Sequence, residues 1–287
     1  MRRTAQRVFL LTLGWEHIPK SWSIHGWDPN DFLTEPVPAV VVETDEGYLL
    51  LDTGFNPALI RDKALNDRFH KRVAGVRVVL PPDEEDPLLV ALETINVSLE
   101  DIKAVAVSHL HNDHSGGLRH FIKGTPIFVQ QRELEFGLHQ FPKAEEHGIF
   151  RVDFDDPRLR FHTLNGHLND VPEEILPGVD AVPTFGHTPG HQSFIIHLTD
   201  GTGMVLAFDA ADLMENFDKE LPVGGVVDID PKATLAHIKT LKSLASEKGY
   251  LLVPGHDPHV WPKLTRLIQQ NGNHIPRHLT TASLYST

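Results

Sequence analysis

The chain has 287 residues, of which 40% are apolar and 23% are charged, values typical of an ordinary globular protein rather than a disordered one. Its formal net charge of −13 disfavours a nucleic-acid partner, because such proteins bind phosphates through clustered lysine and arginine. The sequence contains no cysteine, so disulfides and thiolate metal sites are excluded, and any metal must be held by nitrogen and oxygen.

The apolar runs along the chain are short, and none approaches the roughly 20 residues that a membrane span needs. Residues 1–13 combine a basic start with a short apolar run, but no A-x-A cleavage motif follows, so a first strand is favoured over a signal peptide. The sequence therefore predicts a soluble, cytoplasmic protein without a membrane partner, with secretion as the alternative.

Short runs rich in apolar and β-branched residues predict eight strands, in chain order at residues 8–13, 39–42, 48–51, 104–107, 126–129, 193–198, 204–208 and 250–253. Helical patterns between and after them predict helices at residues 57–71, 87–95, 132–139, 231–248 and 260–270. Asp230 and Pro231 form a favourable start for the fourth helix. This mixture predicts the α/β class, with sheets covered by helices.

Two of the predicted strands end in a similar way. YLLLDTG at 48–54 and MVLAFDA at 204–210 both run into an aspartate, Asp52 and Asp209. This similarity fits a sandwich built from two similar βα halves. Both aspartates would then lie at the same edge of the sheets, where sites in α/β proteins tend to lie. Short echoes of this kind also arise by chance.

The segment SHLHNDHSGG at 108–117 directly follows an apolar run. It places His109, His111, Asp113 and His114 on a tight turn before a helix that is expected to begin near residues 115–117. Neighbouring side chains on a turn point in different directions, so four ligands this close together suit two metals better than one. The following glycines let the backbone turn sharply. The alternative is a chance cluster, because the chain contains 19 histidines. Candidate ligands elsewhere in the sequence are needed to distinguish a metal site from such a cluster.

Three later segments each add a candidate ligand. GHTPGHQ supplies His187 and His191, AFDAAD supplies Asp209, and VPGHD supplies His256. Each segment follows an apolar run, so independent strands deliver ligands at their carboxyl ends, where loops converge. Imidazole and carboxylate ligands favour zinc, with manganese, iron or cobalt as alternatives.

These segments, together with LLDTG, resemble the motifs of the metallo-β-lactamase superfamily. Within it, TPIFVQQRELEFGLH, DAADLMENFDKELPVGGVVDIDP and PGHDPHVW are similar to the N-acyl homoserine lactone lactonases, which hydrolyse bacterial quorum-sensing signals. The resemblance covers about residues 8–267. It implies an αββα sandwich, with two mixed β-sheets flanked by helices, a dinuclear site at one sheet edge, and a single metallo-hydrolase domain over residues 1–287.

The resemblance also implies a role for each motif residue. The first metal would be held by His109, His111 and His191, the second by Asp113, His114 and His256, with Asp209 bridging the two. The two cations would lower the pKa of a shared water, so that hydroxide attacks the lactone carbonyl near neutral pH. Asp113 would orient this nucleophile or pass its proton to the leaving alkoxide. His187 and Asp52 are expected to support ligand imidazoles instead of binding metal.

One position departs from the lactonase pattern. These lactonases usually carry a tyrosine three residues after the bridging aspartate, and this chain has Asp212 there. Asp212 is therefore a candidate catalytic residue with several open interpretations. It is protonated and acts as an acid, or metal polarisation suffices without it, or the substrate differs, or the residue only caps and solvates its loop.

Three tryptophans, Trp15, Trp22 and Trp27, crowd into one amino-terminal stretch. Large aromatic side chains in a loop can line an apolar pocket for an acyl chain. They can equally cover the sandwich or meet a second subunit, and the resemblance suggests a homodimer. Five other histidines are expected on the surface or in packing: His120, His139, His147, His162 and His197.

The sequence as a whole predicts a dinuclear metal-dependent hydrolase that opens the lactone ring of N-acyl homoserine lactones, which are small-molecule substrates. The nearest alternative is a hydrolase of another lactone, ester, thioester or phosphotriester on the same site. An alternative from a different class is a metal-stabilised protein without catalysis. Structural metal sites are usually saturated with ligands, whereas the predicted site leaves a shared position open.

Overall fold

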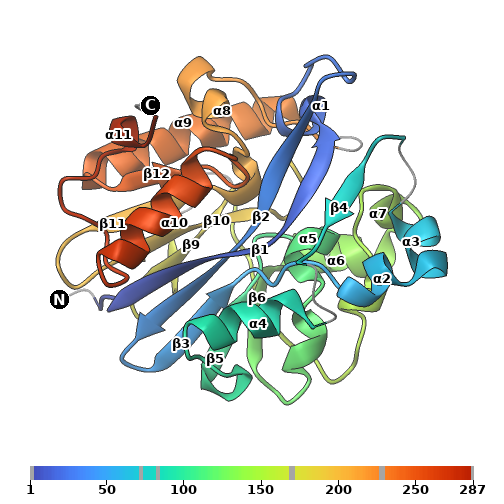
Figure 1. Ribbon diagram of the computed structural model, residues 1–287, viewed down its shortest axis with the longest axis horizontal. Helices are drawn as coiled ribbons and strands as arrows, with labels where there is room; N and C mark the ends of the chain where they lie inside the picture. The colour runs from blue at the N-terminus through green and yellow to red at the C-terminus, as the bar shows by residue number, and fades with distance from the viewer. Residues whose placement is uncertain (1–2, 71–73, 82–84, 168–171, 226–229, 286–287) are drawn as a thin grey trace.

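The computed structural model describes residues 3–70, 74–81, 85–167, 172–225 and 230–285. Two β-sheets pack face to face in these residues, and helices lie on the outer side of each (Figure 1). The predicted α/β class and the αββα sandwich are confirmed.

The larger sheet contains seven strands within the described residues, in the order β4-β1-β2-β3-β5-β6-β7. Neighbouring strands are antiparallel from β4 to β3 and parallel from β3 to β7. Their bounds are β1 Arg7–Pro19, β2 Phe32–Thr44, β3 Gly47–Leu51, β4 Arg77–Val79, β5 Ile102–Ala106, β6 Pro126–Gln130 and β7 Arg160–Leu164.

The smaller sheet runs in the order β12-β11-β10-β9-β8. Its strands are antiparallel except for the parallel pair β11 and β12. Their bounds are β8 Glu173–Leu176, β9 Val179–Pro183, β10 Gln192–His197, β11 Gly203–Leu206 and β12 Leu251–Val253. Each sheet therefore mixes parallel and antiparallel pairs, as the resemblance implied.

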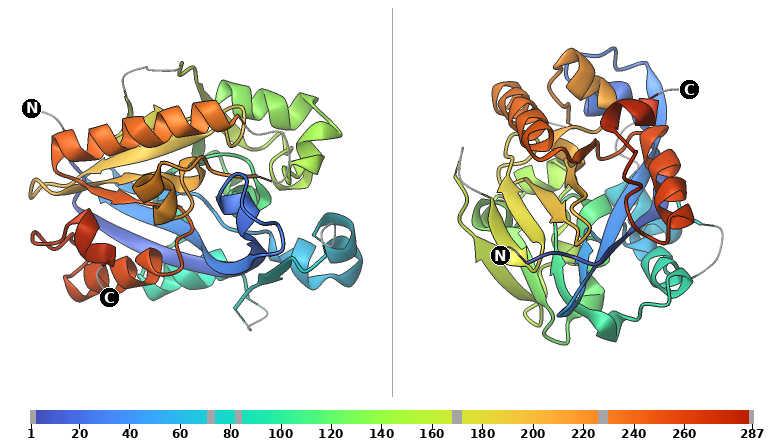
Figure 2. Two further views of the ribbon diagram at one scale, coloured as in Figure 1. Left: turned by 90° about the horizontal axis from the view of Figure 1, so that it is seen from above. Right: turned by 90° about the vertical axis from the view of Figure 1, so that its left-hand side faces the viewer.

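The described residues form both α-helices and 3-10 helices. The α-helices are α1 Lys20–Ser23, α2 Pro57–Arg61, α3 Lys63–Phe69, α4 Pro87–Thr94, α5 Asn112–Ser115, α6 Gln131–His139, α7 Lys143–Glu146, α8 Met214–Lys219, α9 Pro231–Lys248, α10 Val260–Gln270 and α11 Thr281–Tyr285. The 3-10 helices are η1 Leu99–Asp101, η2 Leu118–Phe121, η3 Arg151–Asp153 and η4 Phe208–Ala210. Figure 2 shows α9 lying along the outer face of the smaller sheet, while α4 packs on the larger one.

Strand periodicity explains the two cores. Along β1, Val8 and Leu10 face the smaller sheet, whereas Phe9 and Leu11 face the helices on the other side. A strand buried on both faces therefore shows a continuous apolar run instead of an alternating pattern. The candidate ligand segments follow strands of both sheets, in loops and in the short helices α5 and η4.

The structure refines several sequence predictions. The helices at 231–248 and 260–270 are found as predicted, and the Asp230 side chain accepts hydrogen bonds from the backbone N–H groups of Lys232 and Ala233. The helix predicted at 57–71 is instead two helices, because Asp62 ends α2 and caps α3 with its carboxylate. Residue 71 lies outside the described residues. Strands β4, β7, β8 and β9 were not predicted, since their runs are short and partly polar.

No helix in the described residues is long and apolar enough to cross a membrane.

Candidate metal centre and active site

The first ligand segment follows β5 and turns directly into a short helix. The prediction that this helix begins near residues 115–117 is wrong: α5 spans Asn112–Ser115, so Asp113 and His114 lie inside it. The backbone N–H groups of His114 and Ser115 donate to the His111 carbonyl, which closes the turn. A side chain on Gly116 would collide with the backbone around Asn56, so close packing requires the glycine. Its φ of −62° is one that any residue adopts, so the turn itself does not need a glycine here.

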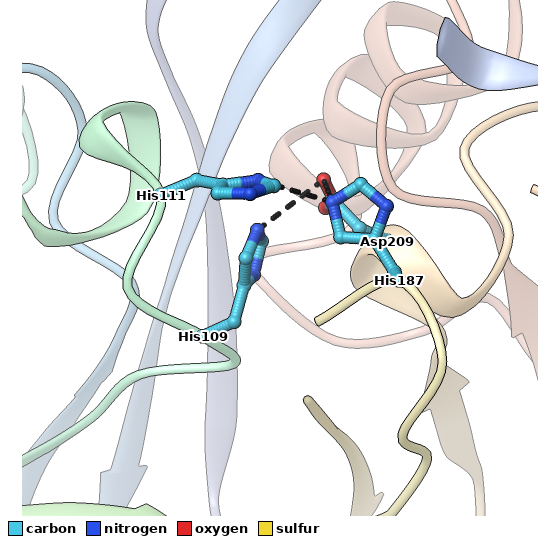
Figure 3. Close-up of side chains that lie close together, drawn as sticks. All are labelled: His109, His111, His187 and Asp209. Carbon is cyan, nitrogen blue, oxygen red and sulfur yellow. Dashed lines mark hydrogen bonds and ion pairs between the residues drawn. The ribbon is translucent and has the colours of Figure 1, made fainter. Parts of the chain in front are cut away.

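The four side chains of this segment are buried and converge on Asp209, which follows β11 in the other sheet. His109 Nε2 lies 3.6 Å from Asp209 Oδ2, and His114 Nε2 lies 3.3 Å from Asp209 Oδ1. Asp113 Oδ2 contacts His114 Nε2 at 2.8 Å. Figure 3 shows His109 and His111 pointing from one side toward Asp209 and His187 on the other.

The remaining ligand segments complete two neighbouring groups of possible metal ligands. One group contains His109, His111, His187 and Asp209, and the second contains Asp113, His114 and His256. His256 Nε2 lies 3.1 Å from Asp209 Oδ1, which places Asp209 between the two groups. A third overlapping group joins Asp209 and His256 to Asp212. The bridging role of Asp209 stays a prediction.

The loop between β9 and β10 carries both His187 and His191. His187 lies closer to the cluster than the sequence indicated, with Nε2 3.0 Å from His111 Nδ1 and 3.2 Å from Asp209 Oδ2. The His191 ring lies 5.1 Å from the His109 ring and 6.1 Å from the His187 ring. Its Nε2 is buried without a hydrogen-bond partner among the described residues. The assignment of His191 as a ligand therefore stays a prediction.

The hydrogen-bond pattern tests whether these residues suit a metal. The Nε2 atoms of His109, His111 and His191 are buried, and within the described part of the chain none has a hydrogen-bond partner. An unsatisfied buried nitrogen is costly, and a cation bound to its lone pair removes that cost. The donors are nitrogen and carboxylate oxygen, which suits zinc and related divalent metals. The residues therefore fit a metal centre.

Other residues hold the imidazoles in place. Asp52 accepts a hydrogen bond from Ser108 N at 2.6 Å, and its Oδ2 lies 2.7 Å from His114 Nδ1. The His256 Nδ1–H donates to the Pro36 carbonyl at 2.8 Å. Each contact fixes the tautomer and turns Nε2 toward the centre, which is how supporting groups orient metal ligands. The expected supporting role of Asp52 matches this geometry.

The electrostatics of the cluster also favour bound cations. Although burial acts to lower it, Asp113, Asp209 and Asp52 hold the pKa of His114 well above its usual value. Burial lowers the pKa of His109 and His111, so these imidazoles are neutral, as metal ligands must be. The carboxylates thus attract positive charge into a space that neutral imidazoles surround.

A pocket opens over this cluster. Its lining includes ligand residues, Trp22 and His147, together with three carboxylates outside the predicted metal ligands: Glu16, Glu35 and Asp212. His147 was expected on the surface or in packing, and the structure places it in the pocket wall. Glu16 and Glu35 were missed, because they belong to β1 and β2, far from every ligand motif, and only the strand pairing reveals them.

A second, more apolar cleft adjoins this pocket. The two share Glu16, Trp22, Asn112 and Gly148, and the cleft is lined further by the aromatic rings of Phe55, Phe69 and Phe150. Of the three tryptophans, Trp22 lines both spaces. Trp27 instead packs its ring against Lys20, whose Nζ lies 3.9 Å from the ring centre.

The fold and the donor set define a class: a two-sheet α/β sandwich with a histidine and aspartate metal centre at the sheet edge. The chain belongs to the metallo-beta-lactamase superfamily, whose sequence pattern matches residues 34–256. The resemblance seen in the sequence is therefore confirmed for the superfamily.

Curated relatives narrow the comparison. The chain is 30% identical over 254 residues to the N-acyl homoserine lactonase AiiA of Bacillus thuringiensis subsp. kurstaki, covering 88% of this chain and 94% of that protein. It is 32% identical over 235 residues to the N-acyl homoserine lactonase AttM of Azorhizobium caulinodans, covering 80% and 85%. The similarity to the lactonase branch, which the sequence motifs suggested, is confirmed.

Solved structures agree with these relatives. An N-acyl homoserine lactone hydrolase with the product N-hexanoyl-L-homoserine bound at its catalytic metal centre superposes with a TM-score of 0.75 at 28% identity, covering 95% of this chain and 98% of that one. The dizinc quorum-quenching lactonase AidC, at 18% identity and a TM-score of 0.61 over 90% of both chains, shares the fold.

Proposed function

We propose that residues 1–287 act as one metallo-hydrolase domain that opens the lactone ring of N-acyl homoserine lactones. The observation that carries this proposal is the convergence of ligands from both sheets on Asp209, at the floor of a pocket with an aromatic side cleft. The related lactonases, and the structural neighbour with a ring-opened product at its metal centre, support the same reaction.

The ligand set is proposed as it was predicted, with His109, His111 and His191 on one side of Asp209 and Asp113, His114 and His256 on the other. Two divalent cations, for which zinc is the best match, would supply hydroxide near neutral pH and polarise the lactone carbonyl. His187 has both ring nitrogens in contact, with Gly224 O and with His111 and Asp209, so we assign it a positioning role.

The chain's own groups would orient the reactants. Asp113 lines the pocket, and although burial opposes the shift, the charge of His114 lowers the pKa of Asp113 to about 2. Asp113 therefore stays ionised at neutral pH and accepts a hydrogen bond from the attacking group. From the same position it can transfer that proton to the leaving alkoxide. Asp113→Asn with full metal content should lower kcat, and an unchanged kcat would remove this role.

Asp212 takes the place beside the substrate that a tyrosine usually has in the related lactonases. Burial and the nearby Asp209 carboxylate raise the pKa of Asp212. Bound divalent cations act in the opposite direction and favour the ionised form, which cannot donate a hydrogen bond to a carbonyl. We therefore assign Asp212 to substrate binding instead of carbonyl polarisation.

A pH-stat screen of the metal-loaded protein tests the reaction. N-acyl homoserine lactones of varied chain length should be hydrolysed, activity should disappear on chelation, and divalent metal should restore it. The same panel should include other lactones, esters, thioesters and a phosphotriester. Turnover confined to one of those classes would replace the proposed substrate, and no turnover of any compound by the fully metallated protein would favour a non-catalytic protein.

The aromatic cleft provides a sharper test of the acyl-chain site. Trp22→Ala should raise KM for long acyl chains more than for short ones, because Trp22 lines both the metal pocket and the cleft. Trp27→Ala is the matched control, since Trp27 packs on Lys20 instead. An equal change for both chain lengths in Trp22→Ala would remove the cleft from acyl binding. The homodimer stays a prediction that light scattering can check.

A further inference from the structure

The buried carboxyl group of Glu133 lies between two loops that carry proposed metal ligands. Glu133 belongs to α6, and its side chain is fully buried. Its Oε1 accepts a hydrogen bond from the backbone N–H of Leu110 at 3.0 Å, and its Oε2 accepts one from the backbone N–H of Gly190 at 2.9 Å. One carboxyl group therefore joins the loop after β5 to the loop between β9 and β10, which belong to different sheets.

The two N–H groups that Glu133 binds are adjacent to proposed ligands. Leu110 separates His109 from His111, and Gly190 directly precedes His191. Both donors are buried and lie outside the strands, so a side chain has to supply their acceptors. The two hydrogen bonds therefore fix the backbone beside the three imidazoles proposed for the first metal.

Close packing keeps α6 against both loops. A Cβ on Gly190 would lie 2.3 Å from the backbone nitrogen of Glu133, so only a glycine lets this loop approach the helix. A Cβ on Gly137, in the next turn of α6, would lie 2.8 Å from Phe154 Cζ and 3.2 Å from Leu110 Cδ1. Both glycines therefore serve close packing between α6 and its surroundings.

A second connection between the same two loops lies beside the first. The backbone N–H of Gln192 donates to the Ser108 carbonyl at 2.8 Å. Ser108 directly precedes His109, and Gln192 directly follows His191. The Glu133 hydrogen bonds and this backbone bond thus hold the segments around His109 and His191 from both sides.

The ligands proposed for the second metal are held by other contacts. His114 Nδ1 lies 2.7 Å from Asp52 Oδ2. The backbone N–H of His256 donates to the Asp212 carbonyl at 2.8 Å, and its Nδ1–H donates to the Pro36 carbonyl. Glu133 therefore acts on one side of the metal centre, and Asp52 acts on the other.

A carboxyl group suits the position of Glu133 because both of its oxygens can accept hydrogen bonds. Burial raises the pKa of Glu133, and the N–H donors of Leu110 and Gly190 oppose that shift. Both the ionised and the protonated form keep two oxygens with lone pairs. A glutamine has a single acceptor oxygen, and its NH₂ group would face the second N–H donor.

We propose that Glu133 is a positioning residue that sets the spacing of the two loops and thereby the affinity for the first metal. The proposal rests on the ligand set of the proposed function and adds a residue that none of the ligand motifs contains. Metal–ligand distances hold to within about 0.2 Å, so a small displacement of one loop weakens metal binding while the domain stays folded. Residues that orient metal ligands typically contribute about 10- to 100-fold to metal affinity.

Competition between the protein and a chelator for zinc tests this role. In Glu133→Gln, one of the two zinc equivalents should bind about 10- to 100-fold more weakly, while the other changes little. Glu135→Gln is the matched control on the same helix, because Glu135 is exposed and bonds only to Gln131 among the printed side-chain contacts of α6. Its two zinc affinities should equal those of the wild type.

A double variant identifies the affected zinc ion. Asp52→Asn removes the contact behind His114 and should weaken the second metal, so Glu133→Gln combined with Asp52→Asn should weaken both zinc equivalents. Gly190→Ala tests the same contact from the opposite loop and should reproduce the pattern of Glu133→Gln, including when Glu133→Gln fails to fold. In the metal-free folded protein, hydrogen exchange at the amides of Leu110 and Gly190 should be faster in Glu133→Gln than in the wild type.

Other outcomes would contradict the proposal. Wild-type affinity for both zinc equivalents in Glu133→Gln, with a lower free energy of unfolding, would show that Glu133 only stabilises the fold. Equal weakening of both equivalents in Glu133→Gln alone would show that it does not act on one metal. Lactone turnover is measured separately: if the wild type binds two zinc ions and hydrolyses no lactone, the proposed reaction is wrong, and the zinc affinities still decide the role of Glu133.

Discussion

Asp52 and Asp209 are two buried aspartates that follow similar strands, β3 and β11, and both contact the imidazole of His114. Asp52 Oδ2 lies 2.7 Å from Nδ1, and Asp209 Oδ1 lies 3.3 Å from Nε2 on the opposite side of the same ring. One aspartate therefore holds the ring from behind, and the other faces it across the metal centre. Similar local sequences have different roles because the sheets approach the ring from opposite sides.

Their electrostatics differ for the same reason. Burial dominates at Asp52 and raises its pKa despite its contact with His114. At Asp209, burial also acts to raise the pKa. The charges of His114, His256 and His109 outweigh this effect and hold the pKa of Asp209 well below its usual value. Asp209 contacts several imidazoles, as the proposed bridging role requires. Asp52 contacts one imidazole and the donors of Ser108. The predictions below test this difference between a ligand and a positioning residue.

The largest effect is expected for Asp209→Asn. Removing the shared carboxylate should lower metal content by at least one equivalent and reduce kcat/KM by about 1000-fold or more, because metal ions supply several kcal/mol of transition-state stabilisation. Elemental analysis and lactone hydrolysis measure both effects. Asp45→Asn, at an exposed turn, is the control. Full metal content in Asp209→Asn would show that Asp209 is not the shared ligand.

His187 and His191, which lie on one loop, allow a second comparison of a proposed positioning residue with a proposed metal ligand. His191→Ala should lose metal, because its buried Nε2 has no other partner in the described structure, while its Nδ1 is held by Thr184 Oγ1 at 2.9 Å. His187→Ala should keep both metals and show a weaker loss of activity, since His187 positions His111. Metal content after dialysis distinguishes the two variants. The reverse result would exchange their roles.

A smaller effect is expected for Asp52→Asn. The variant loses the charge behind His114, so metal affinity should fall by about 10- to 100-fold, as for other residues that orient metal ligands. When metal is in excess, kcat should approach the wild-type value, because Asp52 touches neither substrate nor metal. Competition with a chelator gives the affinity. A kcat loss as large as that of Asp209→Asn at saturating metal would contradict the positioning role.

A third buried aspartate, Asp153, belongs to none of the candidate metal-binding groups and should affect stability alone. Burial raises its pKa to about 7, although it accepts a hydrogen bond from Asn56 Nδ2 at 2.9 Å. The folded state then binds this proton more tightly than the unfolded chain does, so stability falls as pH rises from about 4 to about 7 and levels off above that range. The folded protein is therefore more stable at low pH, where Asp153 is protonated, than at high pH, where Asp153 is ionised.

Asp153→Asn removes this pH dependence. Urea unfolding should show the variant close to the wild type near pH 4 and more stable by about 2 to 4 kcal/mol at pH 8. Lactone hydrolysis at pH 8 should be unchanged. Equal differences in stability at both pH values would mean that Asp153 is ionised throughout and that the gain comes from packing.

Much of the fold could be predicted because its signals are local. The helix α9 begins at the Asp230 cap and ends at Gly249 in a left-handed conformation, both of which are features of neighbouring residues. The strands buried on both faces carry long apolar runs. By contrast, β7 and β8 lie toward the sheet edges with exposed polar residues, and their short runs have no comparable local signature.

The sequence by itself determined the first ligand segment, since His109, His111, Asp113 and His114 follow one strand within a single turn. Only the tertiary structure decided that His114 is the imidazole that Asp52 contacts, that His187 joins the cluster, and that Glu16, Glu35 and Asp212 line the same pocket. The physical reason is that a charged residue on a strand is ordinary in sequence. Whether such a residue destabilises the fold or serves a site depends on which other charges lie beside it. The pairing of the strands and the packing of the sheets decide which charges those are.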